Sequence, residues 1–373
     1  MENFEKYRSC FPHLQSTVYL DHASVSPLAA PVLQAMTDFL SQRHTGEIVD
    51  LDALLQLFAG LRRELARLIH APSPDTIAFV PNTSTGLNIL AQGLDWREGD
   101  RILLTDCEFP ANVYPFLNLR DRGVLVDFVP CLNGCVPTEH LLRYVQKRTR
   151  LISLSLVEFL SGFRHDAAAI GQFCRENEIL FALDGIQALG AVAVDVQAWN
   201  VSFLASGGQK WLLSPMGTGF IYVAPELLPR LAVSSPGWLS VEDAWNFFDY
   251  RLRYLPTAER FEPGTKPALL LAGMLAAAKM LNEVPAVERE KRVLWLSGYL
   301  IRKLREKGLR VLTPEAANER AGIVTFVPRE PPEAVNLRLH GAGVRISLRE
   351  GMLRVSPHFY NTLADLDLLL ELL

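Results

Sequence analysis

The sequence predicts an α/β fold in which a mostly parallel sheet is sandwiched by helices, followed by a smaller α+β unit. Between residues 76 and 223, short apolar runs rich in β-branched residues alternate with segments of helical periodicity, the pattern of a buried parallel sheet. After residue 254 the pattern changes to two long helical segments and then short strand-like pieces. A chain of 373 residues also exceeds what one hydrophobic core normally organises, which favours two domains.

The first part of the chain supplies the predicted large domain. We expect its strands at 77–80, 101–105, 124–129, 151–157 and 179–183, and its helices at 85–93, 111–119, 138–147 and 167–177. In the second part we expect helices at 266–281, 287–307 and 362–373, with strands at 309–312, 322–327 and 352–356. The join falls near the proline-containing stretch 255–263. We therefore predict a large domain at 17–254 and a small α+β domain formed by 1–16 and 255–373.

Composition and charge exclude several classes of protein. With 49% hydrophobic residues, 21% charged residues and a net charge of −4, the chain has no basic surplus, so we expect no nucleic-acid partner. The stretch 197–225 carries a single charge but is broken by glycine and proline, and the N-terminus has no apolar run; we expect no membrane span and no signal peptide. Five cysteines, an odd number, favour free thiols in a reducing compartment, hence a cytoplasmic protein. The Cys131–Cys135 spacing is poor for zinc, so we expect no metal.

One lysine stands apart from the other charged residues. Lys210 is the only charged residue between Gln197 and Pro225, within Ser206-Gly-Gly-Gln-Lys-Trp-Leu-Leu. Apolar surroundings depress the pKa of a lysine, which suits an amine that forms a Schiff base. The alternative is a loop lysine that reaches solvent.

An acid and an amide follow the last predicted strand of the large domain. Asp184 is the only charged residue between Ile179 and Val194, and Gln187 lies three residues later. The carboxyl end of a buried parallel strand is where α/β proteins place ligand contacts. The alternative is that Asp184 caps a following helix.

Two further segments have weaker signals. Asn82-Thr-Ser-Thr-Gly-Leu-Asn follows a predicted strand and opens a helix, where free N–H groups and hydroxyls suit a phosphate. Taken alone, ordinary capping by Ser and Thr is the better explanation of this segment. Arg354, in Leu353-Arg-Val-Ser-Pro-His, could grip a substrate carboxylate through two parallel hydrogen bonds or simply face solvent. His22 is a candidate for substrate binding, against the alternative of a satisfied buried histidine.

A lysine, an acid, a phosphate-type helix start and an arginine are the parts that a pyridoxal-phosphate (PLP) enzyme needs. In order and local sequence they resemble the class V aminotransferases of fold type I, which include cysteine desulfurases, isopenicillin N epimerases, kynureninases and several aminotransferases. The similarity runs from Val18-Tyr-Leu-Asp-His-Ala to Arg354-Val-Ser-Pro-His-Phe-Tyr-Asn-Thr, nearly the whole chain. Its most specific motif is Lys210-Trp-Leu-Leu followed by Pro-x-Gly-x-Gly-Phe, supported by Asp184-x-x-Gln187.

The resemblance implies a role for each matching residue near the PLP ring. Lys210 would hold PLP as a Schiff base and move the substrate's Cα proton. Asp184 would pair with the pyridinium nitrogen, and Gln187 would bond the phenolic oxygen. Phe109, where desulfurases carry His, would stack on the ring. Arg354 would clamp the α-carboxylate of an amino-acid substrate.

The resemblance also implies a phosphate site that two subunits share. Ser84, Thr85, Ser206 and Gln209 would contact the phosphate. Thr265 corresponds to the residue that reaches the phosphate of the neighbouring subunit, which implies a homodimer with shared active sites.

The chain also departs from the pattern of the family. Phe159 falls near a position where many members have Asn, and Val157-Glu-Phe-Leu-Ser-Gly-Phe-Arg favours the epimerase-like branch. No cysteine follows Cys174, so the segment before Arg354 lacks the thiolate of a desulfurase. We expect a PLP enzyme that acts at the Cα–H bond of an amino acid, as an aminotransferase or an epimerase. The alternatives are a cysteine desulfurase or selenocysteine lyase, and a PLP-fold binding protein without catalysis.

Overall fold

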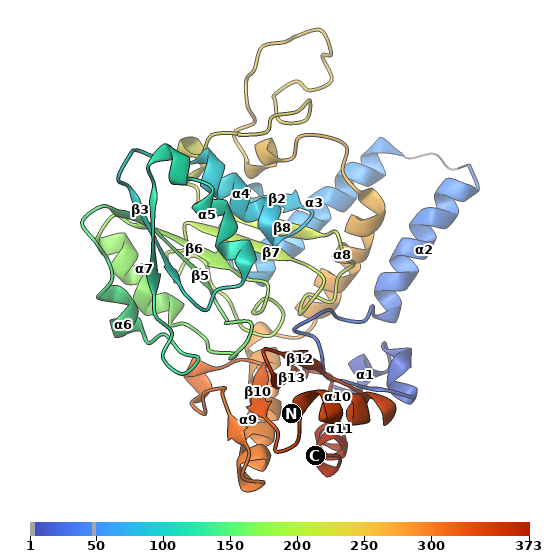
Figure 1. The fold of residues 1–373 in the computed structure, drawn as a ribbon. Coiled ribbons are helices and arrows are strands. Elements are labelled where there is room, and N and C mark those ends of the chain that lie inside the picture. Colours follow the sequence, from blue (N-terminus) through green and yellow to red (C-terminus); the bar gives the residue numbers. More distant parts are fainter. Residues whose placement is uncertain (1–3, 47–49) are drawn as a thin grey trace.

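The structure, a computed structural model, describes residues 4–46 and 50–373. Within them, a seven-stranded sheet in the order β2-β8-β7-β6-β5-β3-β4 forms the centre of the larger part (Figure 1). Strand β8 runs antiparallel to both of its neighbours, and the other pairs are parallel. The mostly parallel sheet is confirmed. Its strands are β2 (Ile77–Val80), β3 (Arg101–Thr105), β4 (Leu125–Val129), β5 (Thr149–Ser155), β6 (Leu180–Asp184), β7 (Phe203–Gly207) and β8 (Gly219–Val223).

Burial explains why these runs form central strands. Every residue of β2, β7 and β8 is buried, as expected for strands covered by helices. The sequence predicted β2 to β6 but not β7 and β8. Their apolar runs are short, because β7 ends at Gly207 and β8 begins at Gly219. Around this sheet α3 packs against β2, α4 against β7 and α7 against β6.

Helices α4, α7 and α8 lie where the periodicity predicts them, and the predicted helix at 138–147 ends early, at Leu142. The sequence did not predict α1, α2 and α3. The predicted helix at 111–119 is much shorter, because Pro110 and Pro115 limit it to a 3-10 turn (Pro110–Asn112) and one helical turn. The bounds are α1 (Glu5–Arg8), α2 (Ala30–His44), α3 (Leu51–Leu68), α4 (Thr83–Gly93), α5 (Tyr114–Leu117), α6 (Thr138–Leu142), α7 (Ala167–Glu176) and α8 (Ala268–Asn282).

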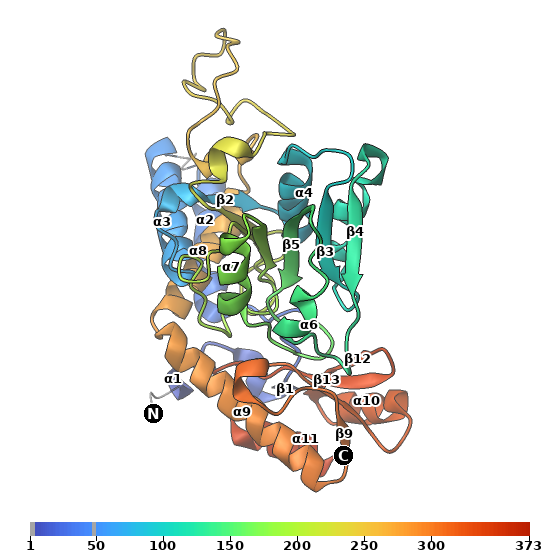
Figure 2. The same cartoon turned by 90° about the vertical axis from the view of Figure 1, so that its left-hand side faces the viewer.

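The C-terminal part forms a second layer below the large sheet in Figure 2. It holds an antiparallel sheet in the order β12-β13-β10-β9 and a parallel pair, β1 with β11. Its helices are α9 (Ala286–Glu306), α10 (Pro332–Gly341) and α11 (Leu363–Glu371), and its strands are β1 (Val18–Tyr19), β9 (Arg310–Val311), β10 (Val324–Val327), β11 (Val344–Arg345), β12 (Ser347–Arg349) and β13 (Met352–Val355).

The hydrophobic side chains fall into two clusters. The larger surrounds the seven-stranded sheet and includes Leu271 and Leu281 of α8, which packs against α2 and α3. The smaller lies between α9, α11 and the antiparallel sheet and includes Leu300, Phe326 and Leu366. The predicted domain boundaries, 17–254 against 1–16 with 255–373, stay a prediction.

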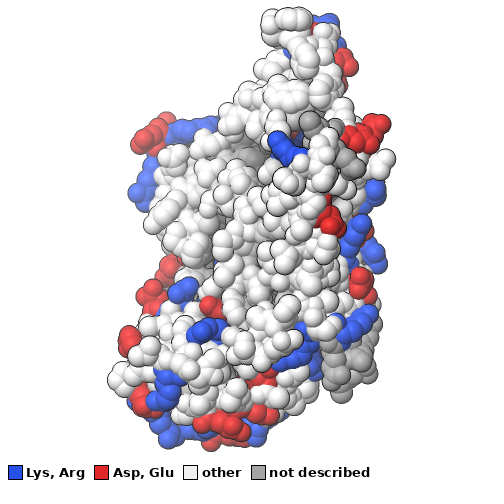
Figure 3. Space-filling model, turned by 90° about the vertical axis from the view of Figure 1, so that its right-hand side faces the viewer, with Lys and Arg blue, Asp and Glu red and all other residues white. Residues whose placement is uncertain are grey.

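Two surface features stand out. The chain between β8 and α8 makes a long excursion at the top of Figure 1 and exposes Trp245, Phe248 and Tyr250. The face that carries α2 has few charged side chains over a broad area (Figure 3), and Leu33 and Leu40 of α2 are exposed. Among the described residues no single helix is long and apolar enough to cross a membrane; only α8 and α9 together, bent by 82°, reach that length and composition.

Candidate active site

A cavity of about 570 Å³ opens at the carboxyl edge of the large sheet. Phe109 follows β3, Phe159 follows β5, Asp184 ends β6 and Lys210 follows β7. Parallel strands bring their carboxyl ends to one edge, so residues far apart in sequence share one site. The cavity is lined by Ala23, Ser24, Asn82, Thr83, Ser84, Phe109, Pro110, Ala111, Phe159, Asp184, Ile186, Gln187, Gln209, Lys210, Arg349, Glu350 and Arg354.

Lys210 presents a half-buried amine to this cavity. Its Nζ lies 5.7 Å from the centroid of the Phe109 ring. Burial disfavours the ammonium form and lowers the pKa of Lys210 to about 8, although the Asp184 carboxylate acts in the opposite direction. A sizeable neutral fraction therefore exists near neutral pH, and the neutral amine is the form that acts as nucleophile and base.

Asp184 lies at the end of β6 and is only 2% exposed. Its Oδ1 accepts a hydrogen bond of 2.9 Å from the backbone N–H of Ile186. Burial raises the pKa of Asp184 to about 6, against the opposing effects of that N–H and of Lys210. Turns follow Asp184, so it does not cap a helix. Its carboxylate is charged at neutral pH and lies in the wall of the cavity.

Gln187 is held in place by both ends of its amide. Its Oε1 accepts a hydrogen bond from Nε1 of Trp211 at 2.9 Å, and its Nε2 donates to the carbonyl of Ala23 at 3.0 Å. An amide nitrogen has two N–H groups, so one remains for a ligand. Gln187 and Gln209 both line the cavity, as the resemblance implied.

The first turn of α4 also borders the cavity. Asn82 caps it by accepting a 2.8 Å hydrogen bond from the backbone N–H of Thr85, and Ser84 lines the cavity. The helix lies so close to the sheet that a Cβ on Gly86 would come within 2.7 Å of the Ile221 side chain. Thr83 Oγ1 accepts from the N–H of Gly207 at 2.9 Å and so joins α4 to the chain that leads to Lys210. A helix start in this place favours an anion.

Arg354 is buried, with 2% of its surface exposed, on β13 of the small sheet. Burial lowers its pKa to about 10, so it remains charged. It donates to the carbonyl of Phe159 at 2.7 Å, to Ser24 Oγ at 2.8 Å and to Ser347 Oγ at 3.2 Å. A guanidinium has five N–H groups, so each terminal nitrogen keeps one for a ligand. Two such N–H groups are what a bidentate carboxylate requires.

Four predicted residues do not line this cavity. Thr85 Oγ1 donates to Asn82 within the cap, and Ser206 is fully buried with its hydroxyl on the carbonyl of Gly207. Thr265 is exposed. His22 is fully buried and its ring nitrogens contact the Ser356 carbonyl and the Tyr360 hydroxyl. The structure therefore does not bring His22 to the substrate, and that assignment finds no support in the geometry.

Sequence reasoning missed three polar residues of the cavity wall, Ser24, Arg349 and Glu350. Ser24 accepts from Arg354 and donates to Asp21. Arg349 and Glu350 line the cavity from the turn between β12 and β13. The sequence places Arg349 five residues and Glu350 four residues before Arg354. That spacing points to one site only once β12 is known to pair with β13.

Buried polar groups support the aromatic wall from behind. Phe109 and Phe159 meet edge to face with ring centroids 5.4 Å apart. Next to them, Glu158 Oε1 accepts from Thr105 Oγ1 at 3.3 Å and lies 3.1 Å from Nε2 of His165. Burial raises the pKa of Glu158 well above its usual value and lowers that of His165 to about 4, so burial disfavours the charged form of each group. The sequence did not indicate this network.

The residues present fit PLP by their chemistry. The cavity brings together an amine with a lowered pKa, a buried carboxylate, an aromatic face and the start of a capped helix. These would serve, in turn, the aldehyde, the pyridine nitrogen, the ring and the phosphate of PLP. The fold and this set of groups define a PLP-dependent enzyme.

Comparisons with known proteins agree. The family model of the class-V aminotransferases matches residues 18–369. An uncharacterised aminotransferase of Bacillus subtilis, YcbU, is 29% identical and the match covers 96% of this chain and 94% of that protein. A probable cysteine desulfurase of Methanothermobacter thermautotrophicus is 30% identical over 99% of this chain and 97% of its own length. The solved structure of the cystine C–S lyase C-DES with cysteine persulfide superposes with a TM-score of 0.88 at 26% identity, covering 97% of this chain and 98% of that one.

The chain belongs to the class-V aminotransferase family, and its cofactor is PLP. Its relatives include both aminotransferases and cysteine desulfurases, so family membership alone leaves the reaction open.

Proposed function

We propose that the protein acts at the Cα–H bond of a free amino acid, as an aminotransferase or an epimerase-like enzyme. The observation that carries this proposal is the presence of Lys210, Asp184 and Arg354 around one cavity. These supply a base, an anionic partner for the ring nitrogen and a carboxylate clamp. A PLP-fold binding protein would not need all three.

The roles of the residues follow from their chemistry. Bound PLP supplies an electron sink for the electron pair left when the Cα–H bond breaks. The neutral amine of Lys210 takes the proton from Cα and can return it. Asp184 keeps a proton on the pyridine nitrogen through its negative charge. The two unused N–H groups of Arg354 hold the α-carboxylate and so orient Cα toward Lys210.

The outcome depends on which residue returns the proton. Inversion at Cα requires a second proton-transfer group on the face opposite Lys210. Among the described residues that line the cavity, Glu350 is the one carboxylate besides Asp184. It is exposed at the rim. Glu350 is therefore the candidate for the second proton-transfer group. Its replacement would abolish epimerisation but not transamination.

A panel of L- and D-amino acids tests the proposal. The holoenzyme is incubated with each in D₂O while its visible absorption band, Cα deuteration and product chirality are followed. Keto-acid formation identifies an aminotransferase. Inversion without keto acid, lost in Glu350→Gln, identifies an epimerase. If no member of the panel exchanges its Cα proton, the proposal fails in favour of a binding protein.

Cysteine desulfurase activity is the second candidate, because several relatives have that name. No cysteine follows Cys174, so the segment before Arg354 has no thiolate to accept sulfur, and serine does not form a persulfide. Incubated with cysteine and a reductant, the protein should form no alanine or sulfide above the background of free PLP. Stoichiometric alanine that disappears in Cys107→Ser would assign desulfurase chemistry. A selenocysteine lyase is tested in the same way with selenocysteine.

The proposal includes a homodimer in the cytoplasm. Thr265 is exposed and lies outside its own subunit's cavity, which suits a residue that completes the site of a partner. The sparsely charged face of α2 offers a surface for such a partner (Figure 3). All five cysteines are free, which supports a reducing compartment.

A further inference from the structure

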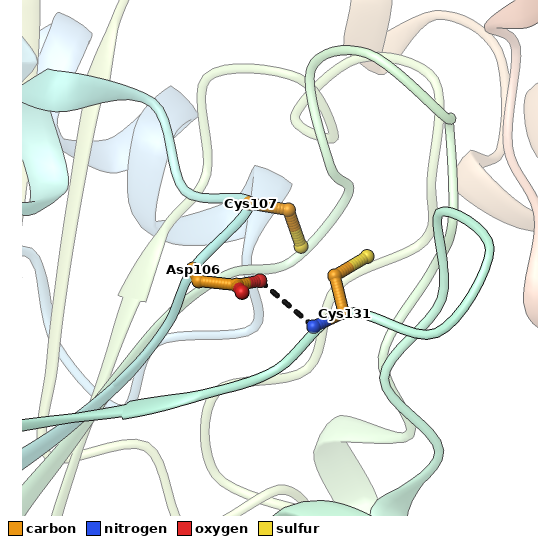
Figure 4. A group of neighbouring side chains, drawn as sticks. All are labelled: Asp106, Cys107 and Cys131. Atoms are coloured by element: carbon orange, nitrogen blue, oxygen red, sulfur yellow. Dashed lines mark hydrogen bonds between the residues drawn. The ribbon is translucent and has the colours of Figure 1, made fainter.

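Two cysteines meet at the carboxyl ends of neighbouring parallel strands. In the register of β3 and β4, Thr105 pairs with Val129, and Cys107 and Cys131 each lie two residues further on. The Cys107 and Cys131 sulfur atoms and a carboxylate oxygen of Asp106 lie within 4.8 Å of one another. Figure 4 shows the two cysteine side chains side by side, with the Asp106 carboxylate beside them. Both thiols are free and partly exposed.

We propose that Cys107 and Cys131 are a redox-active dithiol pair that small disulfides convert reversibly into an intramolecular disulfide beside the active site. The two sulfur atoms lie within 4.8 Å of each other, just beyond the last registered pair of β3 and β4. A disulfide needs its sulfur atoms about 2 Å apart and its Cα atoms about 4.4–6.8 Å apart, and neighbouring parallel strands run about 5 Å apart. Side-chain rotation at the strand ends can therefore close the bond.

The exchange balances in two steps. The Cys131 thiolate attacks one sulfur of the small disulfide, and one small thiolate leaves and takes up a proton. The Cys107 thiol then loses its proton and attacks the Cys131 sulfur, which expels the second small thiol. The two protein thiols are oxidised by two electrons, and the small disulfide is reduced to two thiols.

The pKa values of the two thiols are shifted in opposite directions, which supports Cys131 as the first sulfur to attack. The neighbouring Cys107 thiol, as a hydrogen-bond donor, lowers the pKa of Cys131. The same contact, together with burial, raises the pKa of Cys107, whose sulfur lies 3.5 Å from Thr105 Oγ1. The backbone N–H of Cys131 donates to Asp106 Oδ1 at 2.7 Å, which fixes the segment that carries the attacking sulfur.

Two competing uses of these thiols fit the geometry less well. A Cys131–Cys135 bond would have to close a tight hairpin, in which Leu132 pairs with Cys135 and Asn133 already has a φ of 54°. A structural zinc site needs four ligands. Among the described residues only three candidate ligand atoms meet here, and the Asp106 carboxylate already accepts the N–H of Cys131.

The pair is connected to the cavity wall. Cys107 lies two residues before Phe109, and its partner Thr105 donates to Glu158, the neighbour of Phe159. Oxidation to the disulfide removes the S–H hydrogen of Cys107 from its contact with Thr105, and so alters the hydrogen bonds that reach Glu158. We expect the disulfide to shift the absorption band of bound PLP. Only this spectral readout rests on the proposed function, since the thiol chemistry stands without it.

Peptide mapping of the holoenzyme tests the pair. Trypsin releases Cys107 in peptide 102–120, and Cys131 with Cys135 in peptide 123–143. After treatment with oxidised glutathione, two of the five thiols should be lost and the two peptides should be joined. Dithiothreitol should restore both thiols.

Cysteine variants identify the partners. Cys135→Ser is the matched control, because it removes the second thiol of peptide 123–143 and should keep the crosslink. Cys107→Ser and Cys131→Ser should each abolish it while all three variants retain bound PLP. Three results would overturn the proposal: a bond within peptide 123–143, glutathione adducts that never resolve to a crosslink, or one equivalent of zinc held by the reduced protein and released in Cys131→Ser.

Discussion

The guanidinium of Arg354 donates a hydrogen bond of 2.7 Å to the backbone carbonyl of Phe159. Arg354 belongs to the small antiparallel sheet, and Phe159 belongs to the loop that follows β5 of the large sheet. This bond therefore joins the two sheets at the cavity. It also occupies one donor of the guanidinium, so the proposed substrate clamp and the joint between the sheets share one side chain.

Replacing Arg354 by lysine should weaken substrate binding selectively. Lysine keeps the positive charge but cannot offer two parallel N–H groups. Hydrogen bonds to charged groups contribute about 1.5–3 kcal/mol, so KM should rise by about 10- to 150-fold in Arg354→Lys. The measurement is steady-state kinetics with the best amino acid of the panel. An unchanged KM would show that the carboxylate binds elsewhere.

Neutralising Asp184 should reduce turnover rather than binding. In Asp184→Asn the ring nitrogen loses the charge that keeps it protonated. We expect a loss of at least ~2–4 kcal/mol of transition-state stabilisation in kcat/KM, as for other lost electrostatic contacts in active sites. Single-turnover kinetics of the PLP-saturated variant measure it. Near-wild-type turnover would assign Asp184 a structural role.

Attachment of PLP to the apo chain should depend on pH through Lys210. The neutral amine is the nucleophile, so the rate should rise with pH to a plateau with a midpoint at about 8. Since the Asp184 carboxylate raises the pKa of Lys210, Asp184→Asn should move the midpoint to lower pH. Stopped-flow absorbance across a pH series provides the values. A midpoint near the ordinary lysine value of 10.5 would contradict the buried setting of Lys210.

A dimer should be needed for tight PLP binding. If Thr265 completes the partner's phosphate site, dilution to the monomer should release PLP, and Thr265→Val should weaken PLP retention. Analytical ultracentrifugation that follows the PLP absorbance measures both. A fully active, PLP-saturated monomer would rule out the shared site.

The sequence identified those active-site residues whose side-chain chemistry and place after a strand or within a motif both point to PLP. Asp184 and Gln187 could be placed at the carboxyl end of β6, a strand that the sequence predicts. Lys210 follows β7, which the sequence did not predict, and it was assigned from its isolation and its motif. Arg354 was assigned from its motif. The buried, isolated character of Lys210 was visible in the sequence, since charged neighbours are missing for several residues on either side.

Other contacts depend on pairings that the sequence does not display. Cys107 and Cys131 are 24 residues apart, and only the register of β3 and β4 brings them together. Glu158 and His165 meet because the chain turns back between Val157 and Arg164. His22 has the same residue type as a substrate-binding histidine, but the C-terminal segment around Tyr360 covers it.

Borohydride reduction of the purified holoenzyme, followed by peptide mapping, tests most directly that this cavity is a PLP site built on Lys210. We predict a single reduced PLP adduct, on Lys210, and no reducible adduct in Lys210→Ala. An adduct on any other lysine of the wild-type chain would contradict the assignment of this cavity as the active site.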